Sequence, residues 1–313
     1  MNQPFTASLL LYPEGTIPLP ALRSWELLWT EGIGGCDAFS LYAAPPADPS
    51  RLKMADRITM EHDGERIFTG LVDETERSVG PQGSALTVRG RGMAARLLDN
   101  QVEARLLRRV TTEELLRLYT APLGITAAQA DAAAISNFSV ACGSSAMQVV
   151  QGFCAHAGLL APMFDASGRL LLRKQRQAAG MTLTAKNLRS AVFRDQRYGV
   201  RSRVKLTHVV SGAKLAASNP DFITRGGRSE AYGQYSGSVT PAAWRTAKQR
   251  LDASRLEEYT LELCYVGSVR VRPGTVATVS LPEFSVEGKF VLSSVRWNGS
   301  AQGSTTTLYL RKE

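Results

Sequence analysis

The sequence predicts a mainly β protein in which two similar antiparallel β units bracket a small α+β domain. Three observations predict this class. The layout of apolar runs and turns near residue 60 recurs at the end of the chain, and apolar residues in the middle follow helical spacing instead of strand alternation. With 313 residues and 44% hydrophobic content, the chain is also long enough for two or three domains, each with its own core.

The first copy of the repeated layout lies within residues 55–100. A short strand pattern with Ile58 and Met60 leads through the turn-forming pair Asp63-Gly64 to a run over 67–72. A polar loop containing Gly80-Pro81 and Gly83 then leads to a third run that holds Leu86 and Val88. We expect an antiparallel β unit here.

The second copy lies within residues 274–312. A run ending near Val279 is followed by a turn with Gly288, a run over 290–295, a Gly/Ser-rich loop and a last run. The intervals 18 and 2 that separate Phe68, Leu86 and Val88 also separate Phe290, Leu308 and Leu310. We interpret the two stretches as copies of one unit.

The first β unit is expected to fill residues 1–100. Apolar runs at 5–12, 25–29 and 39–42 alternate with breaks rich in Pro and Gly, which makes about six strands with those above. Gly92-Met93 then begins a short helix that closes one end of the sheet with one apolar face: Met93, Ala94, Leu97 and Leu98.

Residues 101–185 are expected to form the small α+β domain. Thr111 with Glu114, and Ser145 with Gln148, are possible capping boxes, each followed by apolar residues at helical spacing. A hairpin over 159–172 turns at residues 165–168. The 33 residues between Asp131 and Asp165 carry no charge, but their scattered polar residues favour a buried helix over a membrane span.

Residues 186–313 are expected to form the second β unit with a flanking helix. Along 200–210, apolar residues alternate with the three cations Arg201, Arg203 and Lys205, which is typical of a half-buried strand. Residues 211–238 hold five Gly and are expected to form a long loop. Thr240-Pro241 begins a helix to about 258, with four residues facing the sheet: Trp244, Ala247, Leu251 and Ser254.

The sequence has few residues in arrangements that support catalysis, so we expect that the protein is not an enzyme. We assign no catalytic, cofactor-binding or metal-binding residue and no cofactor. His62, His156 and His208 lie in separate segments, the first in a solvated turn and the last on the apolar face of its strand. The acidic pairs 113–114 and 257–258 fit solvated or capped helix ends. The sequence has no Walker loop, GxSxG or HExxH motif. Four dispersed cysteines are expected as buried, reduced thiols: Cys36, Cys142, Cys154 and Cys264.

The balance of 37 Lys and Arg against 28 Asp and Glu gives a net charge of +9. Such an excess favours an acidic protein partner, an anionic surface or nucleic acid. The cations at 201–205 give a positively charged surface of the kind that binds nucleic acid, but few aromatic residues are interleaved with them. A nucleic-acid-binding β protein is therefore the alternative function. We expect no secretory signal and no membrane anchor.

The repeated motifs resemble those of the baseplate hub proteins of contractile phage tails and phage-tail-like bacteriocins, the late-control protein D group. The first unit of that family carries a similar run of turn, Phe-x-Gly, strand, loop and Leu-Thr-Val-x-Gly-Arg. Here it is matched by Phe68, Gly70 and residues 86–91. The family's last unit is similar at Gly288, Phe290, Val295 and Leu308.

The resemblance implies two tail-tube-like antiparallel β-barrels per chain and a trimeric, pseudo-six-fold ring that joins the tail tube to the central spike. It implies these partners: two further copies of the chain, a tail tube or tube-initiator protein, a spike protein and a tape measure protein. No specific nucleic acid is expected. The implied location is the tail baseplate of a virion or tail-like particle, after synthesis in the bacterial host cytoplasm. A tail-associated cell-wall hydrolase is a third possibility, for which the sequence offers no catalytic constellation.

Overall fold

The computed structural model describes residues 5–32, 35–81, 83–236 and 240–313, and the protein is mainly β. Thirteen strands from both ends of the chain form one sheet, with the order β14-β18-β21-β20-β3-β4-β7-β6-β5-β1-β2 and β13 and β19 attached beside β20. Among the described residues, all strand pairings in this sheet are antiparallel except that of β13 with β19. The predicted fold class is confirmed.

The N-terminal unit contains seven strands and one short helix. They are β1 (Thr6–Leu11), β2 (Thr16–Pro18), β3 (Leu22–Thr30), β4 (Ala38–Ala43), β5 (Ala55–His62), β6 (Glu65–Gly80), β7 (Gly83–Gly92) and α1 (Ala94–Asp99), with a 3-10 turn at Pro49–Met54. The turn between β5 and β6 is made by Asp63 and Gly64, both at positive φ, as a tight hairpin requires. The predicted helix is present, but Leu98 is 38% exposed instead of packing on the sheet.

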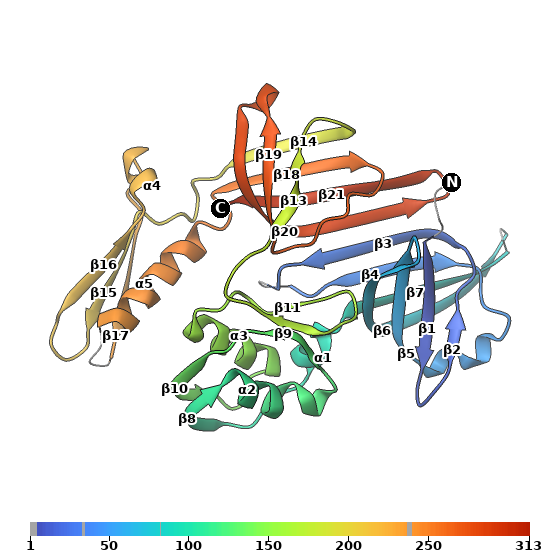
Figure 1. Cartoon of the computed structure of the whole chain (residues 1–313), viewed down its shortest axis with the longest axis horizontal. Helices are drawn as coiled ribbons and strands as arrows, with labels where there is room; N and C mark the ends of the chain where they lie inside the picture. Colours follow the sequence, from blue (N-terminus) through green and yellow to red (C-terminus); the bar gives the residue numbers. More distant parts are fainter. Residues whose placement is uncertain (1–4, 33–34, 82, 237–239) are drawn as a thin grey trace.

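The C-terminal unit contains six strands: β13 (Ala178–Leu183), β14 (Leu188–Asp195), β18 (Tyr259–Val266), β19 (Val276–Leu281), β20 (Val286–Ser300) and β21 (Gly303–Lys312), with a 3-10 turn at Pro282–Phe284. In Figure 1, β13 and β19 run across the direction of β18 and β21, and the first part of β20 runs alongside β19. Side chains from both terminal units form one buried cluster, which includes Leu27, Leu41, Leu292 and Leu308.

The two terminal units have the same strand order. In the first, hydrogen bonds connect β3-β4-β7-β6-β5-β1, and in the second they connect β14-β18-β21-β20-β19-β13. Read along the chain, each strand of the first unit except β2 thus has its counterpart in the second. The units differ in their first strand, because β1 is antiparallel to β5 whereas β13 is parallel to β19.

The middle segment is α+β, as predicted. It contains β8 (Arg105–Thr111), α2 (Thr112–Tyr119), β9 (Ala127–Ala130), β10 (Ala134–Val140), α3 (Ala146–Ala157), β11 (Met163–Phe164) and β12 (Leu170–Leu172), with a 3-10 turn at Ala121–Leu123. Both capping boxes are formed, at Thr111 with Glu114 and at Ser145 with Gln148. The buried side chains of this segment form a second cluster around Phe153. None of the described helices is long and apolar enough to cross a membrane.

A further module is inserted between β14 and β18. Its three strands are β15 (Arg203–His208), β16 (Lys214–Ser218) and β17 (Glu230–Tyr235), and its helices are α4 (Pro220–Thr224) and α5 (Thr240–Ser254). Figure 1 shows α5 lying along this sheet at one side of the molecule. Its small core contains Val204, Leu206, Ala217, Ala247 and Leu251.

This module overturns several expectations. The stretch expected as a loop over 211–238 contains β16, α4 and β17. Trp244 is 47% exposed and Val210 is 87% exposed, so neither packs on the sheet as expected. The expected helix cap at Thr240-Pro241 lies outside the side chains that the structure describes. The division into residues 1–100, 101–185 and 186–313 stays a prediction.

The long hairpins also differ from expectation. The polar loop predicted after residue 72 is absent: β6 continues to Gly80 and β7 begins at Gly83. The Gly/Ser-rich loop near 300 is likewise a hairpin tip, with Ser300 opposite Gly303. Each hairpin has a register shift, between Val72 and Glu74 in β6 and between Leu292 and Ser294 in β20.

The hairpin tips and the register shifts show which residues of the two hairpins are equivalent. This equivalence differs from the one that the sequence suggested. When Gly80 is matched with Ser300, Gly70 falls on Phe290, and Phe68 falls on Gly288. The expected equivalence of Phe68 with Phe290 is therefore wrong by two residues. A slip of two leaves every side chain on the same face of its strand, which is why the apolar pattern conceals it.

Candidate assembly interface

The side chains with catalytic potential are scattered and already engaged. His156 Nδ1 lies 2.7 Å from the Gly152 carbonyl oxygen, and His208 Nδ1 accepts the Ser211 backbone N–H at 3.0 Å. The His62 side chain is only 16% exposed and contacts the Trp297 ring, so the expected solvated turn is wrong. Over the described residues, no group of three His, Cys, Asp or Glu side chains is placed to hold a metal ion.

The cysteines are free thiols, but only Cys154 is fully buried. Burial raises the pKa of the Cys36 and Cys154 thiols to about 12, so neither is a thiolate at neutral pH. Cys142 is exposed and Cys264 is half-buried, which corrects the expectation of four buried thiols. This arrangement gives no sign of an activated nucleophile.

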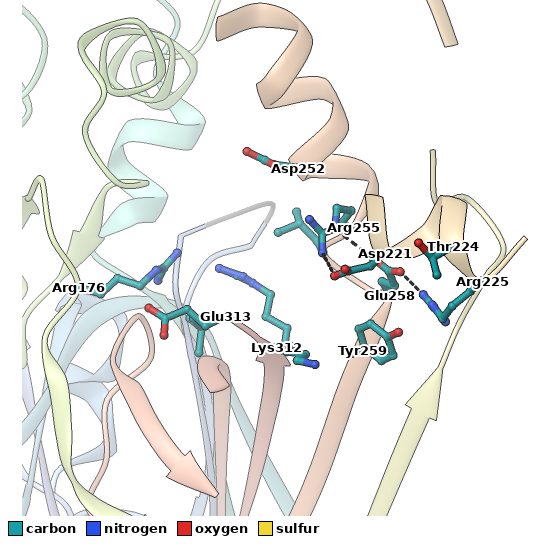
Figure 2. Close-up of a pocket in the computed structure, with 13 residues that line it drawn as sticks. Arg176, Asp221, Thr224, Arg225, Asp252, Arg255, Glu258, Tyr259, Lys312 and Glu313 are labelled. Atoms are coloured by element: carbon teal, nitrogen blue, oxygen red, sulfur yellow. Dashed lines mark hydrogen bonds and ion pairs between the residues drawn. The ribbon is translucent and has the colours of Figure 1, made fainter. Parts of the chain in front are cut away.

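A polar cleft lies between the end of β21, the start of β18 and the inserted module (Figure 2). Glu258, 1% exposed, receives ion pairs from Arg225 and from Arg255, whose Nε lies 3.1 Å away. Arg225 also lies 3.2 Å from Asp195 at the end of β14. Glu258 is therefore not the solvated helix-end carboxylate that was expected: with its two arginines it ties the inserted module to the large sheet.

The basic row of β15 is also paired within the chain. Lys205 Nζ donates to Glu230 Oε2 at 2.6 Å, and Arg203 lies 3.7 Å from the same carboxylate on β17. The hydrogen bond from Lys205 lowers the pKa of Glu230. Arg201 donates to the Ser229 hydroxyl at 2.8 Å. These contacts leave the row with less free positive charge than the sequence suggested.

The strand pair β3–β20 joins the two terminal units, and we call it the internal joint. Residues 24–30 of β3 pair antiparallel with residues 294–300 of β20. Three tryptophans pack there, with ring centroids of Trp29 and Trp297 5.2 Å apart and those of Trp25 and Trp297 6.1 Å apart. Arg296 lies 3.7 Å from Glu26 across the joint. Strand hydrogen bonds, apolar burial and charge thus all hold the units together.

A buried ion cluster closes one end of the internal joint. Glu31, directly after β3, accepts from Arg311 Nη2 at 2.5 Å and from Arg176 Nη1 at 3.2 Å. Burial raises the pKa of Glu31, while the two arginines oppose this rise. The opposite charges of Glu31 and of Arg311 on β21 are thereby held where water is excluded, so loss of Glu31 leaves Arg311 as a buried charge without its carboxylate partner.

In β6, the strand equivalent to β20, the matching position has no second partner strand among the described residues. In β20, residues 286–291 pair with β19 and residues 294–300 pair with β3. In β6, residues 65–71 pair with β5, but among the described residues 74–80 pair on one side only, with β7. Val79 on this free edge is 85% exposed.

The strand equivalent to β3 is open in the same way. β3 lies between β4 and β20, whereas β14 pairs with β18 and ends the sheet within the described part of the chain. Val192 and Phe193 on β14 are each 42% exposed. Each unit thus contributes one strand edge to the internal joint and has a second, equivalent edge that is unpaired among the described residues. This is the geometry of a repeating head-to-tail contact.

Comparison with solved structures identifies the fold. A tail protein from Neisseria meningitidis superposes with a TM-score of 0.77 at 17% identity, over 99% of this chain and 97% of that one. The prophage MuSo2 43 kDa tail protein from Shewanella oneidensis gives 0.79 at 15% identity, over 98% of each chain. The chain has the fold of these phage tail proteins.

A solved structure from a bacterial secretion system has a similar fold. A component of the type VI secretion system from E. coli, described as structurally similar to the T4 bacteriophage tail proteins gp27 and gp5, superposes with a TM-score of 0.57 at 11% identity. It is matched over 97% of this chain and 76% of its own. No protein-family model matches the chain, and the comparison with curated proteins finds no match.

Sequence reasoning found the duplicated unit but missed the open edges. The signal was present in residues 73–80, which carry three acidic residues and no apolar alternation. A strand without a neighbour on one side does not require an apolar face, so it is easily mistaken for a loop.

Proposed function

We propose that the chain is a structural baseplate hub of a phage tail or tail-like particle. In this proposal three copies form a ring of six β units, with the tail tube on one face and the central spike on the other. Two units per chain let a three-fold assembly present six similar positions to a six-fold tube. The protein thereby adapts one symmetry to another without any chemical step.

The observation that carries the proposal is the internal joint together with its two open equivalents. One chain already contains two tail-fold units joined edge to edge through β3 and β20. The corresponding edges of β14 and β6 are left at the outer sides of the two units. A contact that repeats head to tail produces a closed ring when its rotation closes.

The proposed partners follow from this role. They are two further copies of the chain, a tail tube or tube-initiator protein, a spike protein and a tape measure protein, in a particle made in a bacterial cytoplasm. The net charge of +9 favours partners with acidic faces. No catalytic role is assigned, since the nucleophiles and acids described above serve packing and ion pairing.

Nucleic-acid binding is the weaker alternative. Glu230 neutralises part of the basic row, and the exposed aromatic ring Tyr232 lies over Lys205, at 5.5 Å, instead of forming a stacking platform. A gel shift in a salt series separates the two functions. The structural role predicts weak binding that is lost at moderate salt and shows no sequence preference, whereas tight, sequence-dependent binding supports the alternative.

Deletion of the gene in the cell that encodes the chain tests the structural role. Electron microscopy is expected to show no complete tails in the deletion strain, and complete tails after a plasmid copy is supplied. Normal tails in the deletion strain would contradict the proposal.

A further inference from the structure

The internal joint supplies a template for how two copies meet. The register shift between Leu22 and Ser24 on β3, seen against β4, recurs between Leu188 and Ser190 on β14, seen against β18. The equivalence of β3 with β14 is therefore fixed residue by residue, with Ser24 matching Ser190. The hairpin tips fix β20 against β6 in the same way, with Ser300 matching Gly80.

Transferring the register of the internal joint to the open edges gives a defined pairing. In the internal joint Ser24 lies opposite Ser300, Trp25 opposite Gly299 and Leu28 opposite Arg296. The equivalent pairs on the open edges are Ser190 with Gly80, Ala191 with Val79 and Arg194 with Glu76. We propose that residues 75–80 of β6 pair antiparallel, in this register, with residues 190–195 of β14 from the next copy.

The side chains at the open edges complement each other in this register. A large residue faces a small one in the internal joint, Trp25 against Gly299, and the sizes are exchanged at the open edges, with Val79 against Ala191. A Cβ on Gly299 would lie 2.2 Å from Trp25 Cε2, so the internal pair depends on this match. The exposed Val79 side chain gains an apolar neighbour without a clash.

Charges also match in this register. Within one copy Glu76 lies 3.3 Å from Arg89, and Arg194 lies 3.6 Å from Glu262. Placing Glu76 directly opposite Arg194 adds one more attraction to each existing pair and creates a row of alternating charge across the boundary. A carboxylate accepts up to about four hydrogen bonds, so Glu76 can serve both arginines.

The strand that pairs with each open edge belongs to a second copy of the chain and not to an unrelated protein. Both edges of the contact are present on one molecule, and each continues its own sheet. The internal joint packs three tryptophans, two of them buried, whereas the equivalents of Trp25, Trp29 and Trp297 are Ala191, Asp195 and Arg77. The contact between copies therefore buries less apolar area than the internal joint, and its association is expected to be weaker and salt-sensitive.

The inference rests on the proposed ring, and disulfide trapping in the full-length chain tests its register. In a C142S/C264S background, S78C and V192C lie directly opposite in the proposed pairing, within the reach of a disulfide. The matched control is S78C with S190C, which only a two-residue slip would bring opposite. Mild oxidation is expected to give covalent multimers of two and three chains at least tenfold faster for S78C/V192C than for the control.

Three outcomes would overturn the pairing. They are equal or faster trapping of the control, multimers from V192C alone that indicate β14 pairing with β14, and no trapping in either double variant. The solution mass is measured in parallel on the untrapped protein. A mass of three chains without trapping at residues 78 and 192 rejects this register and leaves the ring standing, whereas a single-chain mass without trapping rejects both.

Discussion

Gly299 on β20 and Trp25 on β3 lie directly opposite each other across the internal joint. The indole fills the space that a side chain at Gly299 would need, since a Cβ there would lie 2.2 Å from Trp25 Cε2. Trp25 in turn stacks on Phe5 with ring centroids 4.2 Å apart. The contact between the two units thus depends on one small residue that admits one large one.

Substituting Gly299 tests this dependence. Gly299→Ala is expected to lower the free energy of unfolding by about 1–3 kcal/mol, because the methyl group forces the indole out of its place. Urea unfolding measures the change. Gly80→Ala is the matched control at the tip of the equivalent hairpin, where a Cβ meets nothing within 4 Å, and it should leave the stability unchanged. Equal effects of the two would remove the packing argument.

Glu258 is expected to hold the inserted module on the sheet. Glu258→Gln removes the charge that Arg225 and Arg255 share in a buried position, which should cost about 3 kcal/mol of unfolding free energy. Limited proteolysis should then cut within 203–254 before the rest of the chain. The neighbouring Glu257→Gln serves as control, because its carboxylate accepts a long hydrogen bond of 3.5 Å from Gln196 instead of pairing with arginines. Unchanged proteolysis of the Glu258 variant would contradict this role.

Asp37 is expected to make stability depend on pH. Burial raises the pKa of its carboxyl to about 6, although the hydrogen bond from the Thr30 backbone N–H, at 2.7 Å, acts to lower it. Between pH 4 and 6 the folded state keeps a proton that the unfolded state loses, so stability falls as the pH rises through this window.

Asp37→Asn should remove this dependence. The variant is expected to be more stable than the parent at pH 7, by on the order of 2 kcal/mol, and to approach it below pH 4. Thermal unfolding across pH 4–8 measures the difference, with Glu287→Gln, an exposed residue of β20, as control. A stability difference that does not change with pH would show that Asp37 is not the titrating group.

The contact between copies predicts a coupling between Glu76 and Arg194. Glu76→Gln and Arg194→Gln should each lower the free energy of association. The double variant should lose less than the sum of the two single losses, and the difference, the coupling energy, should be roughly 0.2–1 kcal/mol for each contact between copies. Sedimentation over a concentration series gives the three values. Glu283→Gln combined with Arg194→Gln should be additive, because Glu283 lies on the 3-10 turn before β20. Additivity in the Glu76 pair would argue against direct contact.

The sequence predicted most elements whose signals are local. Both capping boxes, the turn at Asp63-Gly64 and the apolar runs that became β1, β3 and β4 depend on neighbours close in the sequence. The repeat was also visible, because both hairpins end in Gly- and Ser-rich tips. Its register was not, since strand alternation has a period of two and a slip of two changes no face.

What the sequence concealed depends on distant partners. Residues 74–80 look like a loop because one side of that strand has no neighbouring strand in the described part of the chain. The strands and helix within 211–238 have five or six residues each, too short for a period to show among five glycines. Glu258 seemed solvated because Arg225, one of its two arginine partners, is 33 residues away. Tertiary contact, and not local propensity, decides these positions.

Imaging of the assembled protein tests the central claim most directly. Class averages of the purified ring, combined with its measured mass, are predicted to show six similar lobes built from three chains. Three lobes, or six lobes built from six chains, would contradict the claim that two equivalent units in one chain occupy successive positions of the ring.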